Sequence, residues 1–151
     1  MGRDVLQERL RTLILKSGLA LGGLSHPDRA LALAVPARAL ACGAVAGEPQ
    51  VNALLKSSLG AESSFLATDH VELRRWLVDT GWWRRDAFGR RYERVCAPEL
   101  PEALRAIDAA LGDRDLASWV IGQRAAARTA REQRREAWER RRPGGSRGTT
   151  T

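Results

Sequence analysis

The sequence is poor in the residues that metal sites and disulfide frameworks require. It contains only two cysteines, Cys42 and Cys96, and two histidines, His26 and His70. Two cysteines are too few for a disulfide scaffold or a four-ligand zinc site, so we expect both thiols to be reduced. The histidines stand apart from any Cys, Asp or Glu cluster at metal-ligand spacing, which predicts no metal site.

Residue sets that carry out catalysis are missing as well. The chain has no recognisable nucleophile–base set, no paired-carboxylate motif and no glycine-rich phosphate-binding loop. We therefore predict that the protein is not an enzyme and has no cofactor. Nothing in the chain indicates a small-molecule ligand.

Long apolar segments are also lacking. The most apolar region, residues 30–46, is rich in alanine and is interrupted by Pro36 and Arg38. A helix needs about 20 consecutive apolar residues to span a bilayer, so no membrane segment is expected. The N-terminus shows no charged, apolar and small-residue pattern of a secretory signal. A cytoplasmic location is the resulting expectation.

Lysine is scarce although the chain is strongly basic. Of the 25 lysine and arginine residues only Lys16 and Lys56 are lysine, and with 18 acids the net charge is +7. A basic balance favours polyanionic partners because contacts with phosphates release condensed counterions. Arginine also suits phosphate groups and guanine edges. A GC-rich genome, whose codons favour arginine and alanine, is the alternative explanation.

Hydrophobic periodicity predicts a mainly helical fold with one small β-hairpin. The expected helices cover residues 4–16, 25–40, 48–59, 69–80, 99–111 and 113–142. Pro36 predicts a kink or a break in the second helix. Residues 82–95 predict the hairpin, because two short runs rich in aromatics and arginine flank Asp86-Ala87-Phe88-Gly89. Residues 143–151 are expected to form a disordered tail.

The order of helix 48–59, helix 69–80 and hairpin 82–95 is typical of a winged helix-turn-helix. Asp69 and Gly81 mark the ends of the second helix as N-cap and C-terminal glycine. In this fold the second helix enters the major groove, and the hairpin, or wing, lies along the sugar-phosphate backbone. The candidate DNA-binding residues on these two elements are His70, Arg74, Arg75, Arg84, Arg85, Arg90, Arg91 and Arg94.

Some of these residues have an alternative, structural interpretation. Arg75 stands at helical spacing from Glu72 and Asp79 and is able to pair with either. Arg74 is expected to be half-buried with a structural partner. The acids Asp69 and Glu72 near the helix start oppose simple phosphate binding by that N-terminus, or serve as capping groups.

Motifs in the centre of the chain resemble those of a bacterial family. They are VN at 51–52, ELRRWLVDTGWWRRD at 72–86 and GRRYERV at 89–95. Over about residues 48–95 they are similar to DUF2087, a domain of undefined function found in proteins described as transcriptional regulators. The resemblance implies a role in transcriptional regulation.

These observations predict four parts of the chain and two candidate functions. Helices in 1–46 pack on the core, 47–97 is the winged helix-turn-helix, 98–142 is a helical extension and 143–151 is the tail. The first candidate is a DNA-binding transcriptional regulator, with DNA as its partner and a homodimer left open. The alternative is a winged-helix module for protein–protein interaction that uses an exposed Phe65-Leu66 loop and the C-terminal helices.

The arginine-rich segment 124–142 has three interpretations at this point. It is a solvated helix face, an additional nucleic-acid clamp or a dimerisation arm. Only alanines and a few larger residues mark its apolar side, so a coiled coil is disfavoured. A solvated or phosphate-attracted helix is the preferred interpretation.

Overall fold

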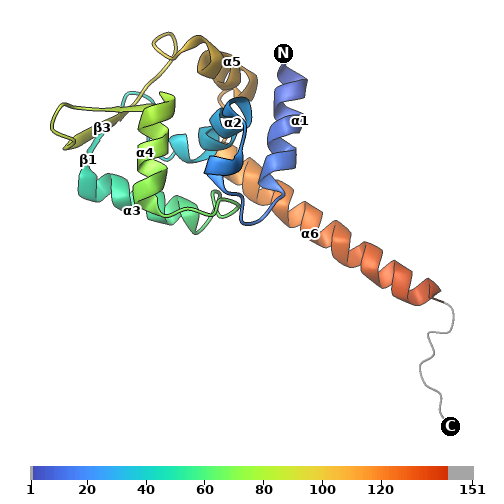
Figure 1. Ribbon diagram of the computed structural model, residues 1–151. Helices are drawn as coiled ribbons and strands as arrows, with labels where there is room; N and C mark the ends of the chain where they lie inside the picture. The colour runs from blue at the N-terminus through green and yellow to red at the C-terminus, as the bar shows by residue number, and fades with distance from the viewer. Residues whose placement is uncertain (1, 143–151) are drawn as a thin grey trace.

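Helices dominate the part of the chain that the computed structural model describes, residues 2–142 (Figure 1). The helices are α1 (Arg3–Ile14), α2 (His26–Ala37), α3 (Glu48–Leu59), α4 (His70–Thr80), α5 (Glu102–Leu111) and α6 (Leu116–Arg141). A short 3-10 helix, η1 (Leu21–Gly23), precedes α2. The mainly helical prediction is confirmed, and the tail expected at 143–151 lies outside the described residues.

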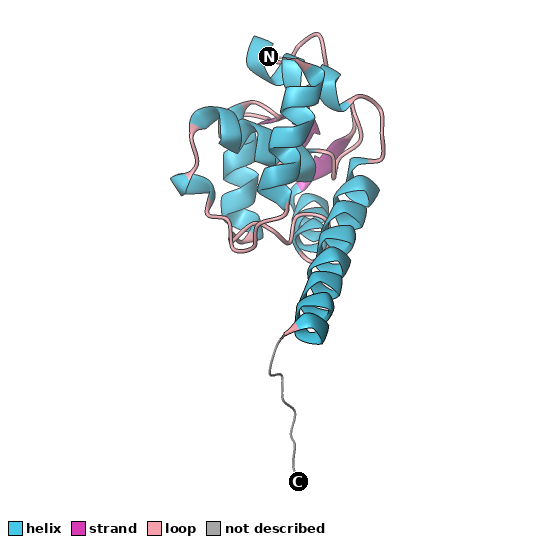
Figure 2. Ribbon diagram, turned by 90° about the vertical axis from the view of Figure 1, so that its right-hand side faces the viewer, coloured by secondary structure: helices cyan, strands magenta, loops and turns pink. Residues whose placement is uncertain are grey.

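A small antiparallel sheet accompanies the helices (Figure 2). Its strands are β1 (Val45–Gly47), β2 (Trp83–Arg85) and β3 (Arg91–Arg94), in the order β1-β3-β2. The hairpin of β2 and β3 was expected from the sequence, but β1 was not. A three-residue strand is too short to show a period-two pattern, and only its pairing with β3 defines it.

The start of α2 carries the capping residue and the proline that the sequence predicted, whereas its end was predicted less well. The Ser25 hydroxyl oxygen accepts a hydrogen bond from the backbone N–H of Asp28, 3.3 Å away, and Pro27 lies in the first turn. Pro36 stands in the last turn, and the helix ends at Ala37, so the break predicted at Pro36 is found and Leu40 lies beyond the helix. Proline lacks the N–H that would continue the helical ladder, which favours an early end.

Gly81 reverses the chain between α4 and the hairpin. At the start of α4 the Asp69 carboxylate accepts the N–H of Glu72 at 2.8 Å, and at its end Gly81 has φ +104°. A Cβ at Gly81 would lie 3.2 Å from the ring of Pro101. Glycine is therefore required here by both its backbone conformation and the approach of Pro101.

Helix α2 lies at the centre of the hydrophobic core. Every residue from Ala30 to Ala37 is buried, and α1, α4 and α5 all contact the helix. Trp82 and Trp83 pack against it, and their indole N–H groups donate to the carbonyl oxygens of Ala30 and Ala37, both at 2.9 Å. The two tryptophans therefore join the base of the hairpin to the core.

The loop between α3 and α4 is buried, which corrects one expectation. Phe65 and Leu66 have exposed fractions of 0% and 6% and belong to the core. The segment pairs with Leu19, whose N–H donates to the Phe65 carbonyl and whose carbonyl accepts from Ala67 N–H, both at 2.9 Å. The prediction of an exposed Phe65-Leu66 docking loop is therefore wrong, because the loop between α3 and α4 packs against the segment that joins α1 to α2.

The two cysteines form a disulfide, so the expectation of reduced thiols is also wrong. Cys42 follows α2 and Cys96 follows β3, with a sequence separation of 54 residues and Cα atoms 5.8 Å apart. Pairing of β1 with β3 brings the two segments together. The number of cysteines rules out a scaffold of several disulfides, but it does not rule out a single bond between two cysteines that the fold brings together.

Helix α6 packs on the body at its start and then projects away from it (Figures 1 and 2). Its buried residues are Leu116 and Val120, both in the first two turns. Arg124 anchors the helix by donating to the carbonyl oxygens of Ile14 and Lys16 at the end of α1. None of the helices within residues 2–142 is long and apolar enough to cross a membrane.

Candidate nucleic-acid interface

A hollow between α4 and the hairpin brings together residues from both predicted DNA-binding elements. It has a volume of about 260 Å³. Arg75 lines it from α4 and Arg85 from β2, while Tyr92 of β3, which is 3% exposed, and Asp79 also line it. Two exposed arginines therefore line one concave surface, together with the half-buried Arg74, an arrangement suited to an anionic group.

The alternation of the strands separates the arginines of the hairpin. Arg85 is opposite Tyr92 and shares its side of the sheet with the buried Trp83, which faces the helices. Arg84 is opposite Glu93 and lies on the other side. Consecutive arginines consequently serve different faces, and only Arg85 belongs to the hollow.

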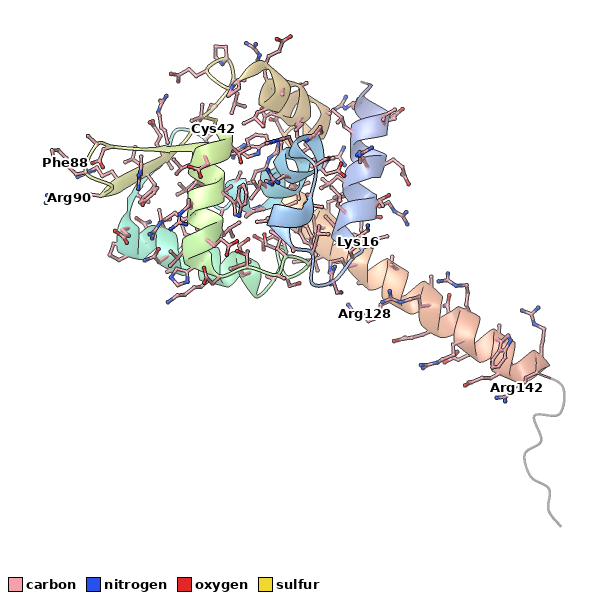
Figure 3. The ribbon with its side chains drawn as sticks, viewed as in Figure 1. Lys16, Cys42, Phe88, Arg90, Arg128 and Arg142 are labelled. Atoms are coloured by element: carbon pink, nitrogen blue, oxygen red, sulfur yellow. A yellow bond between two sulfur atoms is a disulfide. The ribbon has the colours of Figure 1, made fainter. Side chains whose placement is uncertain are left out.

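Asp86 shapes the tip of the hairpin. Its carboxylate accepts the backbone N–H groups of Arg90 at 2.8 Å and Arg91 at 3.4 Å. The pKa of Asp86 lies below its usual value, chiefly because of the Arg90 N–H. Phe88 at the tip is 81% exposed, and the Arg90 guanidinium stands 5.8 Å from its ring centroid (Figure 3). The tip thus presents an aromatic ring and cations to the surroundings.

Arg84 is compensated by acids, which separates it from the other wing arginines. Its guanidinium pairs with Glu93 at 2.8 Å and with Glu99 at 3.3 Å. The hydrogen bonds to Glu93 and then Glu99 raise the pKa of Arg84. A guanidinium that already faces two carboxylates is a poor phosphate contact, so Arg84 does not belong to the candidate interface. Counting the hairpin register would have found Glu93 as its partner.

Arg74 is a structural residue that joins three elements. It donates to the Asn52 side-chain oxygen of α3, pairs with Glu48 at 3.3 Å and stands 5.4 Å from the Tyr92 ring centroid of β3. Its side chain is 16% exposed. The expected half-buried, partnered state of Arg74 is confirmed. The separate sequence motifs at 51–52, 72–86 and 89–95 meet at this guanidinium.

Arg94 is half-buried against α5 and is likewise withdrawn from the interface. Its side chain is 14% exposed, stands 3.6 Å from Asp108 of α5 and donates to the Leu40 carbonyl oxygen. Burial, and then the nearby charge of Arg38, lower the pKa of Arg94. Arg38 pairs with the same Asp108 at 3.2 Å. The sequence prediction missed this because Asp108 is distant in the chain.

The remaining predicted residues are accessible on α4 and the hairpin. Arg75, Arg85, Arg90 and Arg91 are exposed, and none forms an ion pair with an acid anywhere in residues 2–142. His70 is half-buried at the first residue of α4. The pairing of Arg75 with Glu72 or Asp79 that the sequence allowed is therefore not formed. We call Arg75, Arg85, Arg90 and Arg91 the arginine face. Arg91 precedes Tyr92 along β3, so its side chain projects from the Arg84 side of the sheet, beside the hairpin tip.

The exposed surface of α4 beside this face has the opposite charge. Asp69, Glu72 and Asp79 line a shallow depression there together with Arg75, although none of the three forms an ion pair with its guanidinium. The Trp76 side chain lines the same depression and has Arg29 stacked over its ring at 4.5 Å. Exposed positive charge is thus concentrated toward the hairpin rather than along α4.

The central segment of the chain matches one known protein family. Residues 25–94 match the family model DUF2087, described as an uncharacterized protein conserved in bacteria. The resemblance drawn from the motifs is confirmed as a partial match of the chain. The match begins earlier than residue 48 and runs from the cap of α2 through β3. No curated protein and no solved structure matches the chain.

Proposed function

We propose that residues 25–95 form a winged helix-turn-helix that binds double-stranded DNA as part of a transcriptional regulator. The element order α2-β1-α3-α4-β2-β3, with a β1-β3-β2 sheet, is consistent with this fold. It coincides with the extent of the family match. In this proposal α4 follows α3 as the groove-facing helix, and the hairpin is the wing.

The observation that carries the proposal is the arginine face. Four exposed guanidiniums without acidic partners in residues 2–142 lie on α4 and the adjoining hairpin. Such groups bind phosphates with release of counterions, whereas the compensated Arg84 and the half-buried, paired Arg94 do not. Arg75 and Arg85 would hold one phosphate across the hollow, and Arg90 and Arg91 would contact the backbone beside it.

Salt dependence of binding tests the proposal. We expect the affinity for a random 20-base-pair duplex to fall with salt, and each lost phosphate contact to reduce the log–log slope by about 0.9. Replacing Arg90 and Arg91 with alanine should therefore make the slope shallower by about 1.8. The affinity is measured by fluorescence anisotropy at salt concentrations from about 50 to 200 mM, a range over which phosphate contacts cause a large fall in affinity.

A matched variant controls for net charge. Arg84 is compensated by acids and Arg105 on α5 donates to the Pro98 carbonyl, so replacing these two with alanine removes the same charge elsewhere. This control should change the slope far less than the Arg90/Arg91 variant. Equal slopes for the two variants, or no duplex binding at low salt, would show that the arginine face is not a DNA-binding site.

The acidic surface of α4 favours a second candidate function. Asp69, Glu72 and Asp79 would face the negative major groove, and Val71 and Trp76 offer apolar area beside them. A winged helix with this surface suits a protein partner that carries basic residues. Replacement of Glu72 and Asp79 by their amides would strengthen duplex binding if α4 approaches DNA, and would leave it unchanged if α4 binds protein.

Location and redox state are linked in the DNA-binding proposal. A regulator that reaches DNA in bacteria works in the cytoplasm, where thiol systems keep most cysteines reduced. The Cys42–Cys96 bond ties β3 to the segment after α2, next to the proposed wing. In that compartment the bond would be formed only under oxidising conditions.

A further inference from the structure

The arginines of α6 are arranged along one side of the helix. With 3.6 residues per turn, five arginines project from the helix within a sector of about 60° around its axis. They are Arg124, Arg128, Arg131, Arg135 and Arg142. The first anchors the helix to α1, and we call the other four the arginine stripe. Between Arg128 and Arg142 the stripe extends about 21 Å along the axis.

The stripe is not neutralised by the glutamates of its own helix. Glu132, Glu136 and Glu139 occupy an adjoining sector, and within residues 116–142 no arginine comes within ion-pair distance of them. An isolated helix of this length is only marginally stable in water. The part of α6 that projects from the body therefore needs stabilisation by ion pairs along the helix or by a binding partner. The charge of the stripe is thus available to a partner.

Apolar docking does not account for this part of α6. After Ile121, Trp138 is the only residue of the helix with a side chain that is both apolar and larger than alanine. A coiled coil or a membrane-surface helix needs a continuous face of large apolar residues, which alanines do not supply. Trp138 is 58% exposed, and Arg142 of the stripe stands 5.0 Å from its ring centroid. The ring therefore lies beside the cations.

We propose that the arginine stripe of α6 is a second nucleic-acid-binding site that contacts the sugar-phosphate backbone of duplex DNA. Phosphates suit it because the guanidiniums follow one line and lack internal partners. The site is separate from the arginine face, since Figure 3 shows Arg90 and Phe88 at one end of the molecule and Arg142 at the opposite end. The inference thus goes beyond the proposed function and predicts that one protein molecule holds two duplex segments.

Two charge-matched variants of the full-length protein test the stripe. In the first, Arg128, Arg131 and Arg135 are replaced by glutamine. In the second, Arg134, Arg140 and Arg141, which lie outside the stripe sector, are replaced in the same way. Both sets remove three charges, and glutamine preserves helix propensity. Circular dichroism of both variants should show the helix content of the wild type, which checks that α6 is retained.

In a titration with a 20-base-pair duplex in 0.1 M salt, the wild type should bind two duplexes per monomer. The stripe variant should bind at the second of these sites at least tenfold more weakly, with a salt slope for that site shallower by about 2.7. The control variant should lose less than half as much affinity, measured on a logarithmic scale. Equal losses would show that only net charge matters, and no loss would show a solvated helix face; either result overturns the proposal. Loss with the stripe variant but not with Arg90/Arg91→Ala would leave this inference standing and remove the proposed function.

Duplex bridging tests the presence of two sites. Wild-type protein should retain a fluorescent duplex on beads that carry an unlabelled duplex, and the stripe variant should not. Light scattering must show a monomer, since a dimer would bridge with one site per subunit. If the protein is a dimer, and if Ala130→Glu with Ala137→Glu both dissociates it and abolishes bridging, α6 is a dimerisation arm. That result would overturn the inference.

Discussion

The indole N–H of Trp83 donates a hydrogen bond to the Ala37 carbonyl oxygen, 2.9 Å away, and so joins β2 to the last residue of α2. The last carbonyls of a helix have no partner within it, and a buried one needs a donor from elsewhere. Trp83 is 1% exposed, so water does not replace the indole. The contact couples the position of the hairpin to the core.

Trp83→Phe should lower the free energy of unfolding by about 2–4 kcal/mol, because it leaves the carbonyl unpaired and a cavity behind. Urea unfolding followed by circular dichroism measures the loss. Trp138→Phe is the control, since Trp138 is 58% exposed on α6 and its replacement should change stability by less than about 0.5 kcal/mol. Similar losses for both variants would contradict the role of the Trp83 hydrogen bond.

Asp108 is the counter-charge of two half-buried arginines, Arg38 and Arg94. Asp108→Asn leaves both cations facing each other and should cost about 2–4 kcal/mol of stability. Arg94→Met should cost less, about 1 kcal/mol, because the Arg38–Asp108 pair survives and a buried Nε without a partner is removed. Thermal unfolding at one pH compares them. A larger loss for Arg94→Met would contradict this account.

Reduction of the Cys42–Cys96 bond should destabilise the protein. Closing a loop of 54 residues removes conformational entropy from the unfolded chain, worth about 4 kcal/mol in the chain-entropy description. We expect no thiol labelling before reduction, two labelled thiols after it and a lower midpoint of urea unfolding. The double variant Cys42→Ala/Cys96→Ala should be insensitive to reductant. Labelling of both thiols in the untreated protein would rule out the bond.

The hairpin tip should lose its order at acid pH. The pKa of Asp86 is lower in the folded than in the unfolded state because its carboxylate accepts the Arg90 N–H. Its contribution to stability is therefore complete above the ordinary aspartate pKa and is lost as pH falls through the lowered folded value. Amide resonances of Arg90 and Arg91 followed against pH should report a midpoint below about 3.9. Asp86→Asn should abolish the transition at both amides, and a higher midpoint would refute the assignment.

Local signals in the sequence determined most of the helices and the hairpin. Ser25, Asp69 and Gly81 act at helix ends through groups within a few residues, so their effect can be read without the fold. The same holds for apolar spacing in α3 and α4. The end of α2 was less predictable, since Pro36 is compatible with a kink, a break or an end.

Pairings between distant segments were decided only by the tertiary structure. The sequence supplied eight candidate DNA-binding residues, and the fold divided them into an exposed arginine face, the half-buried His70, and three arginines already engaged with Glu48, Glu93 or Asp108. Strand β1, the Cys42–Cys96 bond and the burial of Phe65 likewise depend on packing between segments far apart in the chain. Charge and apolarity are properties of a residue type, but whether a residue is neutralised or covered depends on its neighbours in space, which residue order does not specify.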